Sequence, residues 1–236
     1  GLAIVNLLSI SQGEKITAVV PVRNFEEDKY LVMITRSGVI KKTDMSAFAN
    51  IRKAGLTAVN LREDDELIAA FLTDGSKNIF VATRNGMGIK FNESNVRPMG
   101  RTATGVKAIT LGEGDYVVSS DIVEEGDKLL NVTENGYGKR SDESAFNVQY
   151  RGGKGVKIHQ ITEKTGLLSG VIKGGDNEEL MIVTSEGVII RLRGKEISTF
   201  GRISQGVKLI NLGAGVSVAG VAKIDEEDII EEEIGL

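Results

Sequence analysis

The stretch GVKAITLGEGDYVVSSDIVEEGDKLLNVTENGYGKRS, residues 105–141, decides the fold class. It contains four short runs rich in β-branched residues, separated by turn residues such as Gly-Glu-Gly-Asp and Glu-Glu-Gly-Asp. The pair Asn135-Gly136 is typical of a two-residue type I′ hairpin, because glycine readily adopts the positive φ that this turn requires. The stretch therefore predicts a unit of four antiparallel strands.

This unit recurs along the chain. Its leading glycine motif occurs five times, with spacings of 54, 50, 50 and 51 residues, at Gly1, Gly55, Gly105, Gly155 and Gly206. Its hairpin motif occurs four times, with turn glycines at Gly38, Gly86, Gly136 and Gly187. Repeats of about 50 residues with four strands each are typical of propellers. We expect an all-β, propeller-like ring of four-stranded antiparallel blades, with about five blades or partial blades.

The repeat suggests where the domain divides. The domain at 1–224 is expected to contain four complete repeat units and a half unit, at 1–54, 55–104, 105–154, 155–205 and 206–224. The strand pairs at 2–22 and 207–224 would then be half-blades, which suggests a fragment cut within a repeat. Unpaired strand edges invite association with another chain.

An acidic tail follows at 225–236. It holds seven of the chain's 33 carboxylates, so the preceding residues carry 26 acidic against 29 basic side chains. We expect the tail to be disordered and solubilising. The alternative is an anionic mimic that competes with a ligand for the basic surface of the body and weakens its binding.

Composition argues against several function classes. The chain has no cysteine, so it has neither a disulfide framework nor a cysteine-ligated zinc site, which suits a reducing cytoplasm. It has no long apolar run and no leader segment at its start, so no membrane association is expected. His159, the single histidine, replaces an apolar residue of the repeat, so we expect a packing role. We expect no catalytic residue and no metal site.

Basic residues recur at matching positions of the repeat. They lie two positions after the leading glycine, four positions after the hairpin glycine, and shortly before the leading glycine. We expect a DNA-binding belt made of these and neighbouring residues, namely Lys41, Lys42, Arg52, Lys53, Lys90, Arg97, Arg101, Lys107, Lys139, Arg140, Arg151, Lys154, Lys157, Arg191, Arg202 and Lys208. The alternative is that strand surfaces carry lysine for solubility and edge protection.

The glycine-rich segment QYRGGKGVKI, residues 149–158, is the most basic copy of the connector between units. It lacks the G-x-x-x-x-G-K-[ST] spacing and the following helix of a nucleotide-binding loop. Its glycines instead suit a close approach of the backbone to phosphates, with Arg151 and Lys154 supplying charge. Because aromatic residues are only 5% of the chain, duplex DNA is favoured over single strands that stack on aromatic side chains.

Motifs in order along the chain resemble the C-terminal domain of bacterial DNA gyrase A, a β-pinwheel. They are IVNLL, GEKITAVVPV, SGVIKKT, VRPMGRTATGVKAITLGEGD, ENGYGKR, GRISQGVKLI and the acidic DEEDIIEEE. The family's hallmark Q-R-R-G-G-K-G lies in its first blade, whereas QYRGGKG at 149–155 lies in a later unit and has Tyr150 for the first arginine. The resemblance therefore carries DNA contact to Arg151 and Lys154, but not the special wrapping role of the hallmark.

The resemblance implies a module that wraps duplex DNA and supports negative supercoiling by a cytoplasmic type IIA topoisomerase. The domain itself would be no enzyme and would need no cofactor, since the ATP and Mg²⁺ used by the holoenzyme bind elsewhere. Its partners would be duplex DNA, the remainder of gyrase A, and gyrase B. The alternatives are the related protein of topoisomerase IV, a propeller that serves as a protein-interaction scaffold, and a propeller enzyme, for which no convergent set of polar residues is visible.

Overall fold

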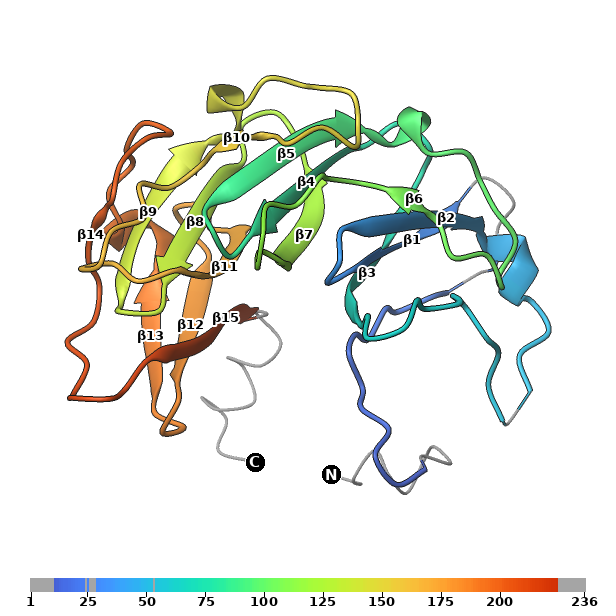
Figure 1. Cartoon of the computed structure of the whole chain (residues 1–236), viewed down its shortest axis with the longest axis horizontal. Helices are drawn as coiled ribbons and strands as arrows, with labels where there is room; N and C mark the ends of the chain where they lie inside the picture. The colour runs from blue at the N-terminus through green and yellow to red at the C-terminus, as the bar shows by residue number, and fades with distance from the viewer. Residues whose placement is uncertain (1–10, 24, 26–28, 53, 225–236) are drawn as a thin grey trace.

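The computed structural model describes residues 11–23, 25, 29–52 and 54–224, and these residues form four antiparallel β-sheets. The sheets follow one another round an arc as the blades of a propeller-like fold (Figure 1). The expected all-β pinwheel architecture is thus confirmed. The described residues contain four blades, where about five complete or partial blades were expected. None of their helices is long and apolar enough to span a membrane.

A β-hairpin forms the centre of each blade. The four hairpins are β1 (Tyr30–Thr35) with β2 (Val39–Asp44), β4 (Asn78–Thr83) with β5 (Met87–Asn92), β8 (Lys128–Thr133) with β9 (Tyr137–Asp142), and β12 (Glu179–Thr184) with β13 (Ile189–Arg193). The four turn glycines have φ between +79° and +83°, as expected for glycine at these positions. The predicted two-residue type I′ turns are nevertheless wrong: glycine is the only residue of these turns with positive φ, and its N–H donates to the carbonyl oxygen of the threonine three positions earlier, which is typical of a longer turn that ends in a left-handed glycine.

The inner strand of each blade pairs with the first strand of its hairpin. These strands are β3 (Leu67–Thr73), β7 (Val117–Val123), β11 (Leu168–Lys173) and β15 (Val218–Ile224). Consecutive inner strands pack beside one another on the concave side of the arc (Figure 1). Both faces of β4 are buried: Ile79 and Val81 pack with residues of the first blade, and Phe80 and Ala82 with residues of the third.

The outer strand of a blade comes from the following repeat. The two-residue strands β6 (Val106–Lys107), β10 (Val156–Lys157) and β14 (Val207–Lys208) pair with β2, β5 and β9 respectively. The chain therefore makes the next hairpin, returns to complete the previous blade, and then adds the inner strand of the new one. Each blade is interlocked with its neighbour.

Blades and sequence repeats consequently do not coincide. The unit 105–154 contains four strands, as predicted, but they belong to three different sheets. The strands expected to form a half-blade at 207–224 instead complete the third sheet through β14 and the fourth through β15. Of the pair expected at 2–22, residues 1–10 lie outside the described part, and 11–22 contain no strand. The acidic tail at 225–236 also lies outside the described residues.

The fourth sheet has three strands within the described residues, in the order β13-β12-β15. The outer edge of β13 therefore has no partner there, and Val188 and Ile189 at this edge are 53% and 56% exposed. Their counterparts in the first blade, Val39 and Ile40, are buried beneath β6. The edge of β13 is thus an exposed apolar surface. In each of the other three blades, the equivalent edge is covered by an outer strand.

The leading glycine of each outer strand is required by steric contact. Gly155 has a φ of +71°, and a Cβ built on it would lie 2.2 Å from the carbonyl oxygen of Gly88. The equivalent distances are 2.4 Å at Gly105 and 2.3 Å at Gly206. A side chain would therefore separate the outer strand from the hairpin that it completes.

We expect Gly155→Ala to lower the free energy of unfolding by about 3–5 kcal/mol, the range of severe core substitutions. Gly114→Ala is the matched control, because Gly114 has a φ of +69° and open space around its Cβ position. Left-handed strain alone costs about 1–2 kcal/mol. Urea unfolding followed by far-ultraviolet circular dichroism measures both; equal losses would show that backbone strain, and not the close approach, sets the cost.

Candidate nucleic-acid interface

Three of the basic residues four positions after the hairpin glycine are buried. Lys42 Nζ donates to the carbonyl oxygen of Glu93 (3.1 Å), and Lys90 Nζ to the carbonyl (3.1 Å) and carboxylate (2.8 Å) of Glu143. Arg140 Nε donates to the carbonyl oxygen of Ile197 (2.7 Å). Each side chain thus joins one blade to the next. Their expected place on a surface belt is contradicted by this burial, and their recurrence has a structural cause.

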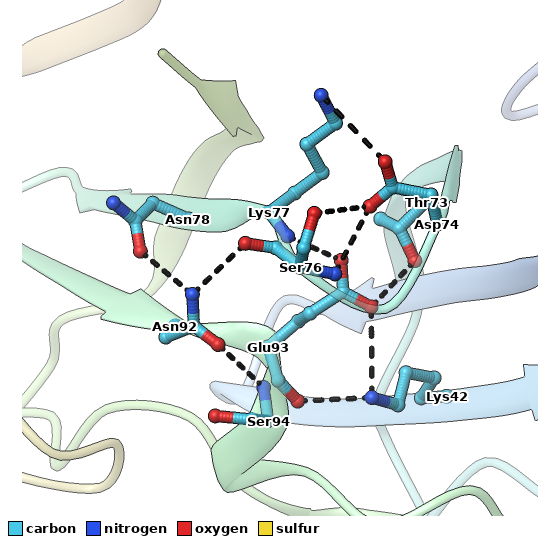
Figure 2. A network of polar contacts seen from close by, with 9 residues as sticks. All are labelled: Lys42, Thr73, Asp74, Ser76, Lys77, Asn78, Asn92, Glu93 and Ser94. Carbon is cyan, nitrogen blue, oxygen red and sulfur yellow. Dashed lines mark hydrogen bonds and ion pairs between the residues drawn. The ribbon is translucent and has the colours of Figure 1, made fainter. Parts of the chain in front are cut away.

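Glu93 shows how such a joint is satisfied. It is fully buried in the 3₁₀ turn η3 (Glu93–Asn95) of the second blade. Its carboxylate accepts hydrogen bonds from Thr73 Oγ1 (2.8 Å) and the backbone N–H of Lys77 (2.9 Å), and lies 3.5 Å from Lys42 Nζ (Figure 2). A buried carboxylate needs hydrogen-bonding partners in place of water, and these contacts supply them. The network clamps the first blade to the second.

Lys41 and Lys139 are also buried, and again the expected surface position is contradicted. Lys41 Nζ donates to the carbonyl oxygens of Ala58 (2.5 Å) and Arg101. Lys139 Nζ donates to those of Gly201 (2.8 Å) and Arg202 (2.6 Å). Burial lowers the pKa of each lysine to about 8, and the nearby arginine adds to the effect. Both lysines hold a connector from beneath.

The connector arginines are half-buried and bind the backbone of the preceding outer segment. Arg151 Nη1 donates to the carbonyl oxygen of Lys107 (3.0 Å), and Arg202 Nη1 to that of Lys157 (2.8 Å). Arg101 makes the same bond to Thr57 (3.0 Å). A guanidinium carries five N–H donors, so these bonds leave others for a ligand. The contacts place Arg151 next to Lys107 and Arg202 next to Lys157, which gives two pairs of cations on the rim.

Four further lysines are exposed along the same rim, three of them on the outer strands. Within the described part of the chain, no carboxylate lies within ion-pair distance of their ammonium groups. We call the exposed and half-buried set the rim band; it comprises Arg101, Lys107, Arg151, Lys154, Lys157, Arg202 and Lys208. The outer strands place the band on the convex side of the arc (Figure 1). The structure thus brings together seven of the sixteen expected site residues.

Of the remaining expected residues, Arg52, Arg97 and Arg191 are not counted in the rim band, because no hydrogen bond or ion pair among the described residues joins them to its members. Arg52 and Arg97 are exposed. Arg191 is exposed on β13, and Lys53 falls outside the described residues. Neither a metal cluster nor a nucleotide loop accompanies the band: no group of three or more metal-binding side chains occurs among the described residues, and Gly155 leads into strand β10.

The concave side differs in its charge. Arg36 pairs with Glu66 (2.9 Å) and Arg84 with Glu134 (2.8 Å), and both guanidinium groups lie near the ring of Tyr116, at 4.0 and 5.3 Å from its centroid. Each of these two guanidinium groups is therefore paired with a carboxylate, unlike the lysines of the rim band. The sequence did not lead us to these residues or to Glu93 and Glu143, the glutamates that bind Lys42 and Lys90. The recurrence of Asn-Glu-Ser at 92–94 and Asp-Glu-Ser at 142–144 was the available signal for the joints.

His159 is buried, as expected for a packing role. Its Nε2 lies 3.1 Å from the carbonyl oxygen of Gln205. Gln205 belongs to the same connector as Gly201 and Arg202, whose carbonyl oxygens bind Lys139. Burial, and then the charge of Lys139, lowers the pKa of His159 to about 4. The imidazole is therefore neutral at physiological pH and contributes no charge to the rim.

Comparison with known proteins gives the chain its relatives. Four segments, residues 29–74, 77–124, 127–173 and 178–225, match the family described as DNA gyrase C-terminal domain, beta-propeller. The chain is 60% identical over 228 residues to DNA gyrase A of Halalkalibacterium halodurans, and 45% identical over 228 residues to that of Clostridium acetobutylicum. These alignments cover 97% of this chain but 27% and 28% of the relatives, so the chain spans about a quarter of their length.

Solved structures agree on the fold. A crystal structure of the C-terminal domain of DNA topoisomerase IV superimposes with a TM-score of 0.90 at 29% identity, covering 100% of this chain and 74% of that one. A structure of the DNA gyrase A C-terminal domain gives a TM-score of 0.83 at 26% identity, covering 95% and 75%. The backbone does not separate these two relatives, whereas the 60% sequence identity favours gyrase.

His159, the single histidine, allows a direct test of the buried contacts beneath the connectors. Its ring proton resonances should stay constant from pH 8 down to about pH 5 and move only near pH 4, because the folded pKa lies well below the ordinary 6.5. Since the unfolded chain takes up this proton first, the contribution of His159 to stability is lost as pH falls from 6.5 towards 4. Nuclear magnetic resonance titration measures the pKa. Lys139→Met should raise it, and a titration near pH 6.5 in the unaltered chain would contradict the burial of His159.

Proposed function

The chain belongs to the family of the DNA gyrase C-terminal domain, and from this membership we propose that it binds duplex DNA along the rim band and bends the duplex round its convex side. The observation that carries the proposal is that a connector arginine is hydrogen-bonded to the backbone of an exposed lysine on successive blades. Arg151 binds the carbonyl oxygen of Lys107, and Arg202 binds that of Lys157. Each pair presents two cations at one point of a curved surface. Repetition of such a point from one blade to the next suits a polymer that carries a phosphate at every nucleotide.

The chemistry of the rim band favours duplex backbone over other polyanions. Lysine and arginine contact phosphates without reading bases, so binding should be independent of sequence. Tyr150 is the one exposed aromatic side chain in the connectors between blades that the structure describes. Single-strand binders stack successive bases on aromatic platforms, and a lone tyrosine supplies no such series. The curvature of the rim would impose a bend on the duplex.

The role in a larger protein follows from the relatives. As part of a DNA gyrase A protein, the chain would hold DNA wrapped while the rest of a type IIA topoisomerase cuts and passes strands, in the bacterial cytoplasm. The remainder of gyrase A, together with gyrase B, would be its partners, and the sites for ATP and Mg²⁺ would lie in those parts. A role in topoisomerase IV is the alternative within the same fold.

One observation favours a second candidate function, that of a protein-interaction scaffold. The outer edge of β13 exposes Val188 and Ile189 and has no strand partner among the described residues. An extended peptide could pair with such an edge through its backbone. Binding of this kind would persist at moderate salt, whereas phosphate contacts weaken steeply.

We expect Lys107→Ala and Lys157→Ala each to weaken binding to unrelated duplexes alike, by about 8-fold at about 0.1 M salt. Each lost phosphate contact should flatten the plot of log affinity against log salt by about 0.9. Mobility shifts across a salt series measure both quantities.

Lys77→Ala is the control for net charge, because Lys77 pairs with Glu124 (2.5 Å) at the start of β4, away from the outer strands. Equal losses for all three variants would mean that only net charge matters. Arg151→Lys adds a second comparison, since it keeps the charge but loses the planar donors that hold Lys107. Absence of salt-dependent duplex binding by the unaltered chain would refute the proposed function itself.

A further inference from the structure

The third blade contains a groove that extends beyond the rim band. It has a volume of about 340 Å³ and lies beside the hairpin turn of β8 and β9, where Tyr137, Lys164 and Lys208 line it. The ammonium groups of Lys164 and Lys208 lie 5.4 and 5.9 Å from the centroid of the Tyr137 ring. Lys208 is also the cross-strand partner of Tyr137. Two segments far apart in sequence thus bring two cations to one aromatic ring.

The charges in this groove are uncompensated. Both lysines are exposed, and no carboxylate among the described residues is within ion-pair distance of either. Tyr137 itself is only 7% exposed, so its ring forms the floor of the groove and is not available for stacking with a base. A ring face attracts each ammonium group weakly and so holds the two like charges near each other. Such an arrangement is stabilised when an anion binds between them.

The first two blades lack this arrangement. The loop that carries Lys164 leads into Leu168 of β11, and the corresponding loops lead into Leu67 of β3 and Val117 of β7 at the same register. Counted back from these strands, the position of Lys164 is occupied by Glu63 and Glu113. Counted forward from the leading glycine, the third loop has Glu163 at the matching position, and it is one residue longer, so it carries both a glutamate and Lys164. Tyr137 corresponds to Val39 and Met87, which pair with Lys107 and Lys157. Lys164 is therefore an additional cation of the third loop, whereas the corresponding loops of the first two blades are acidic.

We propose that the groove of Lys164, Lys208 and Tyr137 is a phosphate-binding site for the duplex backbone, specific to the third blade. The inference rests on the proposed function, and it adds Lys164 to the interface. Each ammonium group offers three donors, so the pair can hold the two non-bridging oxygens of one phosphodiester or bind adjacent phosphates. No base contact is involved.

The site sets where the duplex can run. The acidic loops repel phosphates from the hairpin-turn end of the first and second blades, so a bound duplex stays on the outer strands there. At the third blade Glu163 and Lys164 leave the same loop without net charge, and the two lysines of the groove allow the backbone to extend towards the hairpin turns. The path of the DNA should therefore be displaced towards that end as it passes from the second blade to the third.

A charge reversal tests the site by loss. Lys164→Glu makes the third loop acidic like the loops of the other two blades, and it should lower duplex affinity by at least about 8-fold at about 0.1 M salt and flatten the salt slope by about 0.9. Lys195→Glu is the matched control, because Lys195 is exposed in the 3₁₀ turn η5 (Gly194–Glu196), at the far end of the fourth blade. Equal effects of the two reversals would overturn the proposal.

The reciprocal change tests the site by gain, which misfolding cannot mimic. Glu113→Lys introduces a lysine into the corresponding loop of the second blade and should raise duplex affinity and steepen the salt slope. Glu125→Lys, at the opposite end of β7, is its control. If Glu113→Lys raises affinity no more than Glu125→Lys does, the idea that this loop position contacts phosphate fails.

Two further outcomes separate this inference from the proposed function. If Lys107→Ala and Lys157→Ala weaken binding while Lys164→Glu acts only as Lys195→Glu does, the function stands and the third-blade site is refuted. If the unaltered chain binds no duplex, the function fails first. Selective displacement of DNA by excess inorganic phosphate at constant ionic strength, lost in Lys164→Glu, would identify a free-phosphate site and would also overturn the assignment to duplex backbone.

Discussion

The contact on which the rest of the structure depends is the close approach of a glycine to the hairpin of the preceding blade. At Gly105, Gly155 and Gly206 the chain turns with positive φ and lies against a backbone carbonyl, with no room for a side chain. Only then can the two following residues add an outer strand to a sheet begun in the preceding repeat. The same contact places a lysine on the outside of that strand, so one steric requirement fixes both the interlocking of the blades and the position of the surface charge.

Basic residues in this protein serve two purposes that look alike in the sequence. Lys42, Lys90 and Arg140 cross from one blade to the next, and their charges are satisfied by carbonyl and carboxylate oxygens. Breaking a buried pair of this kind costs about 3–5 kcal/mol, because it leaves the partner charge uncompensated. Lys41 and Lys139 support the connectors from below and have carbonyl partners. The surface charge is thus carried by a different set of side chains, which the buried set holds in place.

Local pattern in the sequence predicted what local physics determines. The turn glycine at Gly136, the β-branched runs around it and the period of about 50 residues were sufficient for an all-β propeller. The partner of each strand was not predictable, because the pattern of Val156 and Lys157 specifies a strand but not the sheet that it joins. Burial of Lys42 was hidden for a related reason: its acid partner, Glu93, lies 51 residues away in the next repeat. Exposure of the outer-strand lysines did follow from alternation along the strand.

Interlocked blades alter how such a protein can change its size. Every repeat contributes to the sheet before it and to the sheet after it, and a segment of one period removed from any starting point rejoins strands of matching kind. The chain therefore imposes no privileged boundary on duplication or deletion. The number of blades, and with it the length of DNA that such a rim could hold, can vary while every internal joint is preserved.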